Sequence, residues 1–221
     1  MKAFIHSLFK WNVQNKHIII GIFKFCYFIA CIGLLIVAYF VAQKEYIIGI
    51  YSTALMAAQI AIVFFCISIT PGILRRFSIR GSLISFLMLY RRQLGISTFI
   101  FAFYHYAAIN LFPILFAGQP FVLFLPLFEL FGIFSLFAMS LLFFTSNNWS
   151  VKKFGRWWSR IHTLIYLIAW TIFLHVFLQG ISFWSLLIGS FAILETISLV
   201  YFYTRKHHAN KKAHHHTHHI S

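Results

Sequence analysis

Long, nearly uninterrupted runs of apolar residues dominate this chain, and short polar connections separate them. A helix needs about twenty apolar residues to cross the hydrocarbon core of a bilayer. Six runs meet this length, so the pattern predicts an all-α membrane protein built as a six-transmembrane-helix bundle. The expected helices cover residues 18–42, 46–69, 94–116, 121–145, 159–179 and 181–203.

Prolines and charged clusters refine the ends of these helices. We expect Pro71 and Gly72 to end the second helix, and we expect Pro126 to kink the fourth. The apolar run 83–90 lies between clusters of arginine. It is therefore expected to form an interfacial helix on the membrane surface.

The charges of the connections alternate along the chain. The N-terminal segment, the 70–93 and 146–160 connections and the C-terminal tail each contain several lysines or arginines. The 43–45 turn carries one lysine and one glutamate, and residues 117–120 and 179–180 carry no charge. Because cytoplasmic loops carry the excess of Lys and Arg, we predict that both termini and the two long loops are cytoplasmic.

The chain then divides into three parts without a domain linker or an internal repeat. Residues 1–17 form an N-terminal cytoplasmic segment, and residues 18–203 form the six-helix domain. Residues 204–221 are basic and rich in histidine. A polar tail of this kind is expected to be a disordered cytoplasmic segment.

Composition excludes a soluble domain. Hydrophobic residues make up 61% of the 221 positions, and the mean hydropathy is +0.85. A soluble domain of this size has no core large enough to bury that much apolar surface. The formal net charge of +15 would favour nucleic-acid binding in a soluble protein, but membrane topology explains the charge here. We predict contact with the lipid bilayer and no nucleic-acid partner.

Three histidines, His105, His162 and His175, lie inside or at the mouth of the apolar runs. Ionisable residues within a membrane are costly, and they usually face the bundle interior and serve a function there. The whole chain holds only three acidic residues. Imidazoles without carboxylate neighbours favour ligation of a metal or haem over a proton relay. A zinc site is disfavoured, because no Cys, Asp or Glu is positioned to complete tetrahedral ligation.

Counting residues from the cytoplasmic side places two of these histidines at one depth. His105 follows Arg92 by 13 residues, and His175 follows Arg160 by 15. At about 1.5 Å per residue, their depths differ by about 3 Å, whereas His162 lies about 16 Å from His105. We therefore predict that His105 and His175 clamp one haem iron, with His162 apart from them near the cytoplasmic face.

The third histidine has no evident partner. His162 and His175 are 13 residues apart, which is about 140° on an ideal helix. They share a face only if the fifth helix is distorted or if two ligands approach from different sides. The sequence predicts one complete bis-histidine site and a second, incomplete one, for which His17 is a weak candidate partner. A hydrogen bond from His162 to a neighbouring helix is the alternative.

The arginines of the basic loops have two interpretations. Membrane topology alone explains them, or some of them hold haem propionates or a flavin phosphate near the cytoplasmic face. We select Arg91, Arg92 and Arg160 as cofactor-binding candidates from the wider set of Arg75, Arg76, Arg91, Arg92, Arg156 and Arg160. We assign no residue a catalytic role in the strict sense.

Several short strings support a family resemblance over roughly residues 46–180. The chain resembles the MsrQ (YedZ) family, the haem-binding subunit of the periplasmic methionine sulfoxide reductase system, within the ferric reductase-like transmembrane group. The strings are Ile69-Thr70-Pro71, Arg91-Arg92-Gln93-Leu94-Gly95, Tyr104-His105, Phe144-Thr145-Ser146, Lys153-Phe154-Gly155, Trp158, Ile161-His162, Tyr166-Leu167 and His175.

The resemblance implies a cofactor and a direction of electron flow. It implies that His105 and His175 ligate a b-type haem and that His162 is a third haem-associated ligand. Members of the family pass electrons from the cytoplasm or the quinone pool across the bacterial inner membrane to a periplasmic molybdopterin reductase. Some also carry flavin mononucleotide (FMN). We therefore expect one haem b, with a second haem and FMN as further candidates.

The sequence as a whole predicts a multi-pass transmembrane b-type cytochrome of the inner membrane. It is expected to be an electron-transfer subunit of an oxidoreductase system more than a self-contained enzyme. Because about eighteen residues follow the sixth helix, we expect no fused flavin or nicotinamide domain, so quinol or a separate flavin reductase is the expected donor. The alternatives are a stand-alone ferric or quinone reductase, and a haem-free small transporter or structural membrane protein.

Overall fold

The computed structural model describes residues 13–44, 47–120 and 124–218, and side chains as far as residue 208. Within these residues, six helices are long and apolar enough to span a membrane. The all-α class and the six spans predicted from the sequence are therefore confirmed. Apolar side chains along the outer faces of these helices are exposed, as in Phe25 and Leu35, which fits a surface covered by lipid.

The spans differ in how continuous they are. The third span consists of α4, a π-helical turn η1 and α5, and the fifth span contains α8 and α9. The helices are α2 (Lys16–Ala42), α3 (Ile47–Arg76), α4 (Ser82–Tyr106), η1 (Ala107–Leu111), α5 (Phe112–Phe116), α6 (Leu127–Phe144), α7 (Asn148–Phe154), α8 (Arg156–His162), α9 (Leu164–Phe177) and α10 (Phe183–His218).

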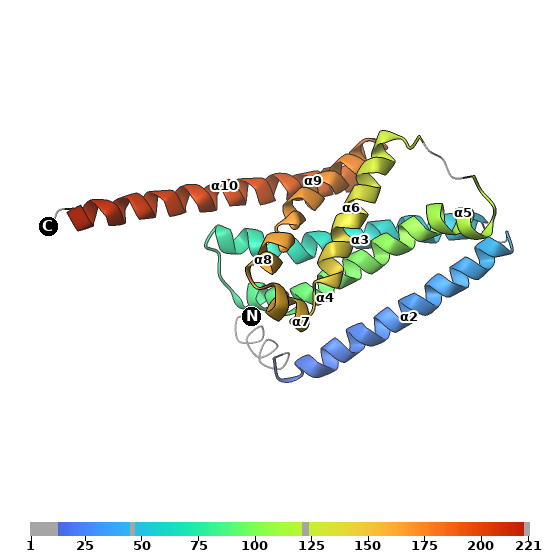
Figure 1. Ribbon diagram of the computed structural model, residues 1–221, viewed down its shortest axis with the longest axis horizontal. Helices are drawn as coiled ribbons and strands as arrows, with labels where there is room; N and C mark the ends of the chain where they lie inside the picture. Colours follow the sequence, from blue (N-terminus) through green and yellow to red (C-terminus); the bar gives the residue numbers. More distant parts are fainter. Residues whose placement is uncertain (1–12, 45–46, 121–123, 219–221) are drawn as a thin grey trace.

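Five of the spans pack into one bundle, and α2 lies at its edge. α3 packs most extensively on α4, α6 packs on α9, and α10 packs on both α9 and α3. α2 contacts α4, η1 and α5, and it runs along one side of the bundle in Figure 1. The main core lies where α3, α6, α9 and α10 meet, and its fully buried side chains include Phe65, Ile168 and Ile188.

The predicted end of the second helix is wrong. α3 continues past Pro71 to Arg76, and Pro71 is among the most deeply buried residues. Membrane helices tolerate proline because neighbouring helices and Ser or Thr hydroxyls compensate for the lost backbone bond. Here the Thr70 hydroxyl donates to the Cys66 carbonyl at 2.7 Å, in the turn that precedes the proline. The helix ends instead before Ser78, whose φ is +63°.

The separate interfacial helix predicted at 83–90 is also wrong. Those residues form the first turns of α4, which runs without a break from Ser82 to Tyr106. The arginines that suggested a boundary, Arg91 and Arg92, lie inside this helix. Long basic side chains can extend along a helix to polar surroundings, so their charges did not require the helix to end.

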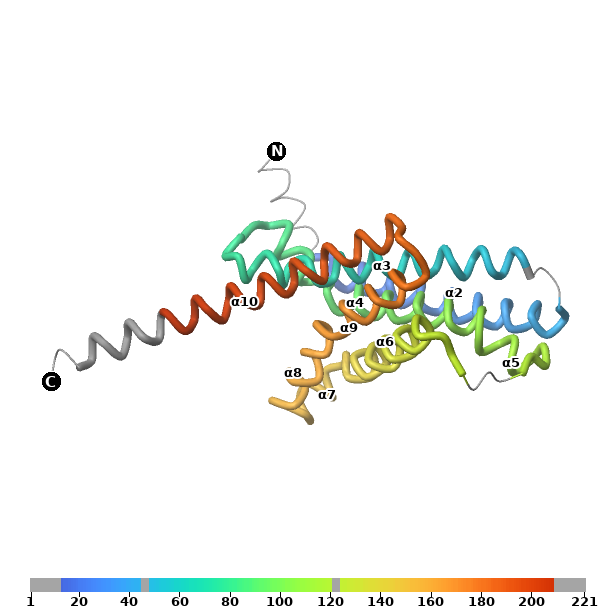
Figure 2. Tube along the Cα trace, turned by 90° about the horizontal axis from the view of Figure 1, so that it is seen from above, coloured from blue at the N-terminus to red at the C-terminus, as the bar shows by residue number. Residues whose placement is uncertain are grey.

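One further prediction about a helix end is corrected. Pro126 does not kink the fourth span but precedes its first residue, Leu127, in an extended conformation, a position where the missing N–H of proline costs nothing. α10 runs to His218, and its part up to residue 208 projects beyond the bundle (Figure 2). The disorder expected of the tail stays a prediction. After Gly189 the sequence contains no glycine or proline, so nothing in it interrupts the helix.

Candidate haem-binding site

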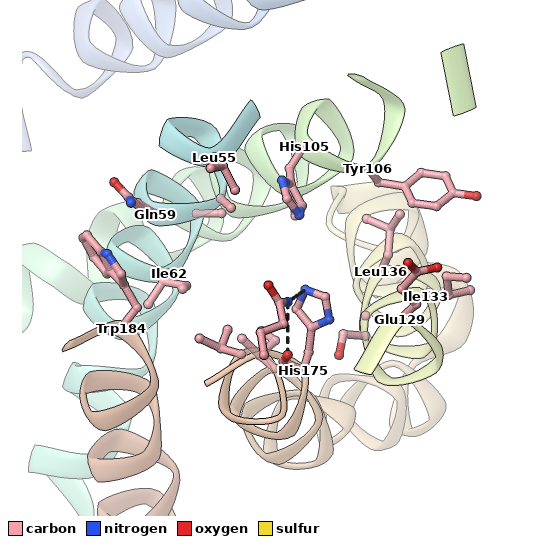
Figure 3. Close-up of a pocket in the computed structure, with 18 of the residues that line it drawn as sticks. Leu55, Gln59, Ile62, His105, Tyr106, Glu129, Ile133, Leu136, His175 and Trp184 are labelled. Atoms are coloured by element: carbon pink, nitrogen blue, oxygen red, sulfur yellow. Dashed lines mark hydrogen bonds between the residues drawn. The ribbon is translucent and has the colours of Figure 1, made fainter. Parts of the chain in front are cut away.

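His105 and His175 face one another across a cavity of about 460 Å³. His105 extends from α4, and His175 extends from the last turn of α9. Figure 3 shows the two rings on opposite sides of the cavity. Their centroids are 6.5 Å apart, and the ring planes are inclined by 69°. The structure thus brings together the two histidines that the depth count paired.

This separation suits a single metal ion between the two imidazoles. Two metal–nitrogen bonds of about 2 Å each, with about 1 Å from each nitrogen to its ring centroid, give about 6 Å between centroids. The cavity between the rings is mostly apolar, with Ile62, Ile133, Leu136 and Ile172 among its walls. The two imidazoles are therefore spaced to hold one metal ion between them, within a largely apolar cavity.

Both histidines are held by backbone carbonyl groups. The Nδ1 atom of His105 lies 3.1 Å from the Ala54 carbonyl oxygen of α3. The Nδ1 atom of His175 lies 2.7 Å from the Phe128 carbonyl oxygen of α6. A carbonyl oxygen only accepts, so each Nδ1 carries the proton and each Nε2 keeps its lone pair. This is the arrangement in which outer partners orient metal-ligating histidines.

Gly132 on α6 permits the close approach of His175. A Cβ atom at this position would lie 2.7 Å from Nδ1 and 2.8 Å from Cε1 of the His175 ring. Real Cβ atoms do not come this close to other atoms, so any larger residue would push the ring or the helix away. Sequence reasoning missed Gly132. A lone glycine within an apolar helix was the available signal.

Several polar side chains line this cavity. Gln179, one turn after His175, places its Nε2 atom 3.3 Å from the His175 Nε2 atom and donates to the His175 carbonyl at 3.1 Å. Asn110 and Glu129 also line the cavity. Any ligand that binds the His175 Nε2 atom must therefore displace the Gln179 amide.

A π-helical turn follows His105 and carries Asn110 to the cavity. Pro113 has no backbone N–H, so the regular hydrogen bond to the Ile109 carbonyl cannot form. η1, which contains Ile109 and Asn110, lies immediately before the short helix α5 that contains Pro113. Such turns occur often at functional sites. Sequence reasoning missed this feature, although Pro113 was its signal.

A second cavity, also of about 460 Å³, lies beside the first. Thr98 and Met139 line both cavities. The second one is lined by His162 and by the arginines of α3 and α4, so we call it the basic cavity. Its lining includes Arg76, Arg91, Arg92, Trp158, His162 and Tyr166. His162 is thus placed in a different cavity from the other two histidines.

The hydrogen bonds around His162 favour a proton on its Nε2 atom, whereas His105 and His175 carry theirs on Nδ1. The Thr145 hydroxyl donates its one proton to the Leu141 carbonyl at 2.6 Å, so it accepts from the His162 Nε2 atom at 3.2 Å. The Trp158 ring lies 4.2 Å from the His162 ring, and its indole N–H donates to the Thr145 carbonyl. The fifth span is interrupted next to it, between α8 and α9.

The predicted arginines have three different environments. Arg91 lines the basic cavity and makes no hydrogen bond or ion pair within the described part of the chain. Arg92 lines the same cavity, and its guanidinium donates to the Asn148 side chain at 2.9 Å. Arg160 lies over the exposed Trp157 ring at 4.7 Å and does not line the cavity. His17, the weak candidate partner of His162, is exposed on α2.

Arg76 is the centre of a buried polar cluster that the sequence did not reveal. Its guanidinium forms an ion pair with Glu195 of α10 at 3.0 Å. It also donates to the Ser198 and Tyr166 hydroxyls at 2.9 and 2.8 Å. Glu195 is only 3% exposed. Since these two residues are 119 positions apart, no local sequence pattern connects them.

Comparison with known proteins identifies the class of this protein. Residues 48–174 match the family model of the ferric reductase-like transmembrane component. This match covers more than half of the 221 residues. The chain therefore belongs to the ferric reductase-like transmembrane family and is a multi-pass membrane protein.

Curated relatives narrow the resemblance further. The chain is similar to the protein-methionine-sulfoxide reductase heme-binding subunits MsrQ of Brucella ovis, Brucella canis and Brucella suis. Identity to each is 34% over 107 residues, which is 44% of this chain and 45% of each relative. The aligned region therefore spans less than half the length of these relatives. The resemblance predicted from the sequence strings is confirmed. No solved structure matches the chain.

Proposed function

We propose that this protein is a transmembrane b-type cytochrome that transfers electrons across the bacterial inner membrane. The facing pair of His105 and His175, each with Nδ1 held by a carbonyl, is the observation that carries this proposal. A bound haem supplies reversible one-electron transfer. The similarity of the chain to relatives that are named as heme-binding subunits supports the same assignment.

The residues of the cavity have separate tasks in this proposal. His105 and His175 would hold the haem iron through their Nε2 atoms, and the carbonyls of Ala54 and Phe128 orient the two rings for this role. Gly132 leaves room for the His175 ring. The apolar walls exclude water, which stabilises the bound group and tunes its reduction potential.

The distribution of charge supports the proposed orientation in the membrane, on which the proposed direction of transfer rests. The basic cavity and the arginine-rich connections lie at one end of the bundle, and the positive-inside rule assigns that end to the cytoplasm. Electrons then enter from quinol or a separate flavin reductase at the basic end and leave from the His105–His175 cavity. We propose a periplasmic methionine sulfoxide reductase, a molybdopterin protein, as the acceptor. The relatives support the reductase part of this proposal, because they are named as heme-binding subunits of a protein-methionine-sulfoxide reductase.

The basic cavity is the proposed entry side. Arg91 and Arg92 are suited to an anionic group there, whereas Arg160 faces away from it. A second haem at His162 and a bound FMN stay predictions. The Nε2 proton that His162 gives to Thr145 does not favour iron ligation through that atom.

A stand-alone ferric or quinone reductase is the second candidate, because the family description itself names a ferric reductase. Such an enzyme would turn over soluble ferric chelates or quinones as a purified single protein. The proposed cytochrome subunit is expected to reduce them far more slowly than it reduces its protein acceptor. The transporter and structural alternatives are disfavoured by membership of a reductase family.

Absorption spectra of the detergent-purified protein test the proposal. We expect a Soret band that shifts and a sharp α-band that appears on reduction with dithionite. His105→Ala and His175→Ala should each remove most of this signal, while replacement of the exposed His207 by Ala should leave it intact. A wild-type protein without these bands, or a His175→Ala variant with full signal, would contradict the proposal.

A further inference from the structure

The lining of the His105–His175 cavity includes exposed residues of the α9–α10 connection, at the end of the bundle opposite to the described arginines. Its mouth is formed by α6 and by the turn between α9 and α10. We define the outer mouth as the lining residues Asn110, Glu129, Gln179, Ile181 and Ser182. Gly180, with φ of +143°, makes this turn tight, so the chain reverses only a few residues after His175.

Glu129 gives the outer mouth a negative charge that no described residue neutralises. Its carboxylate makes no hydrogen bond or ion pair in the described part of the chain, where Arg76–Glu195 is the ion pair present. Among the described lining residues of this cavity there is no lysine or arginine. Figure 3 shows Glu129 on the α6 side of the cavity, opposite the α3 wall.

The rest of the described chain makes this charge unusual. Its arginines gather around the opposite end, and the described residues of the α5–α6 and α9–α10 connections contain no lysine or arginine. Lys44, on the α2–α3 connection, is the described cation of the outer side. A carboxylate therefore stands beside the electron-transfer cavity on the face where the protein carries almost no other charge.

The outer mouth also has apolar surface of the kind that protein interfaces use. Ile181 is 78% exposed, and it lies in the turn between α9 and α10, outside the span that begins at Phe183. A hydrated metal cation needs several converging ligands, yet the described residues include no group of three or more His, Cys, Asp or Glu side chains. The combination of one carboxylate, amides and an apolar rim is suited to a protein partner.

We propose that the outer mouth is the docking surface for a soluble electron-acceptor protein whose contacting face carries lysine or arginine. This inference rests on the proposed function, since it assumes that electrons leave through this cavity. Glu129 pairs with a cation of the acceptor, and the amides of Asn110 and Gln179 add hydrogen bonds. A rim charge of this type acts mainly on the association rate and on its dependence on salt.

Binding of a lysine-rich probe protein tests the docking surface without any need for haem. The protein is placed in nanodiscs of zwitterionic lipid, and the affinity for ferricytochrome c is compared with that for acetylated ferricytochrome c, whose lysine charges are removed. At low ionic strength we expect the wild type to prefer the native probe. Glu129→Gln should weaken binding of the native probe by about 3-fold and Glu129→Lys by about 10-fold.

Two controls make the result specific. Lys153→Gln changes one charge at the basic end and should leave the probe's affinity within about 2-fold of the wild type. Re-oxidation of dithionite-reduced protein by the native probe should slow in the Glu129 variants by the same factors as binding weakens, when rates are expressed per reduced haem.

Three outcomes overturn the inference. Equal affinities and equal salt dependence in wild type and Glu129→Gln would exclude the outer mouth as the docking surface. Re-oxidation by the small cation hexaammineruthenium(III) that slows in the Glu129 variants as much as re-oxidation by the protein probe would also exclude it, because a small ion reports local charge without docking. An effect of Lys153→Gln as large as that of Glu129→Gln would do the same. Absence of haem in the wild type contradicts the proposed function alone, because the binding measurement does not depend on it.

Discussion

At the scale of single residues, two backbone carbonyls decide what the histidines of the cavity can bind. The carbonyls of Ala54 and Phe128 take the Nδ1 protons of His105 and His175, so both Nε2 lone pairs remain for a ligand. Thr145 does the reverse at His162 by accepting from Nε2. The hydrogen-bond partners therefore give the three histidines two different tautomers: His105 and His175 carry the proton on Nδ1, and His162 carries it on Nε2.

Gln179 should compete with haem for His175. Its amide lies 3.3 Å from the Nε2 atom that the iron would bind, and a hydrogen bond of this kind is worth about 1 kcal/mol, or a factor of about 5 in affinity. We expect Gln179→Leu to bind haem several-fold more tightly in titrations of the apoprotein. Gln59→Leu, a change at another lining residue, is the control and should have little effect. Weaker binding by Gln179→Leu would show that the amide supports the site.

Gly132→Ala should displace the His175 ring. The added methyl carbon would lie 2.7 Å from Nδ1, so the ring must turn and lose its bond to the Phe128 carbonyl. We expect haem affinity to fall by about 10-fold or more and the low-spin signal in electron paramagnetic resonance to change. Gly33→Ala, which would meet nothing within 4 Å, is the matched control. Equal spectra and affinities in the two variants would contradict this role.

At the scale of elements, distortions and ion pairs position the helices that carry the site. The π-helical turn before Pro113 brings Asn110 to the cavity, and the break between α8 and α9 separates the settings of His162 and His175. α10 is joined to α3 through Arg76 and Glu195. These features determine how the side chains of the six spans are placed around the cavities.

The Arg76–Glu195 ion pair should be important for stability. Both side chains are largely buried, at 15% and 4% exposure, and removal of one member of a buried pair costs about 3–5 kcal/mol. We expect Glu195→Ala to lower the thermal unfolding temperature, measured by circular dichroism in detergent. The double variant Arg76→Leu with Glu195→Leu should lose less, because it leaves no unpaired charge. A loss equal to that of the exposed Arg205→Ala variant would refute this prediction.

At the scale of the whole molecule, charge separates the two ends of the bundle. One end holds the basic cavity and most of the described arginines, and the other holds the His105–His175 cavity and Glu129. This polarity fits the proposal that electrons enter and leave through different surfaces of the protein. Thr98 and Met139 line both cavities, so only these side chains need to be crossed to pass from one cavity to the other.

Labelling with a membrane-impermeant maleimide tests the proposed topology. In a cysteine-free background, Gln119→Cys should be labelled from outside intact spheroplasts, because the residue is exposed in the α5–α6 connection. Arg156→Cys should be labelled only after the membrane is opened. The reverse pattern would place the basic end outside the cell and invert the direction of transfer proposed here.

The amino-acid sequence by itself determined the class of fold and the identity of the central pair. Six apolar runs long enough for a bilayer define the spans, because hydrophobic length is a property of local sequence. The depth of His105 and His175 follows from a fixed rise per residue. The family strings around Arg91 and His162 are also local.

Only the tertiary structure decided how the site is built. α3 ends at Arg76 and not at the predicted proline, because packing and nearby hydroxyls allow a membrane helix to continue past proline. α6 begins at Leu127, directly after Pro126, so that proline does not kink it. The carbonyl partners of the histidines, the contact of Gly132 with His175 and the Arg76–Glu195 pair join residues of different helices. Such contacts depend on how the helices pack, and neither hydrophobic length nor periodicity along one helix contains that information.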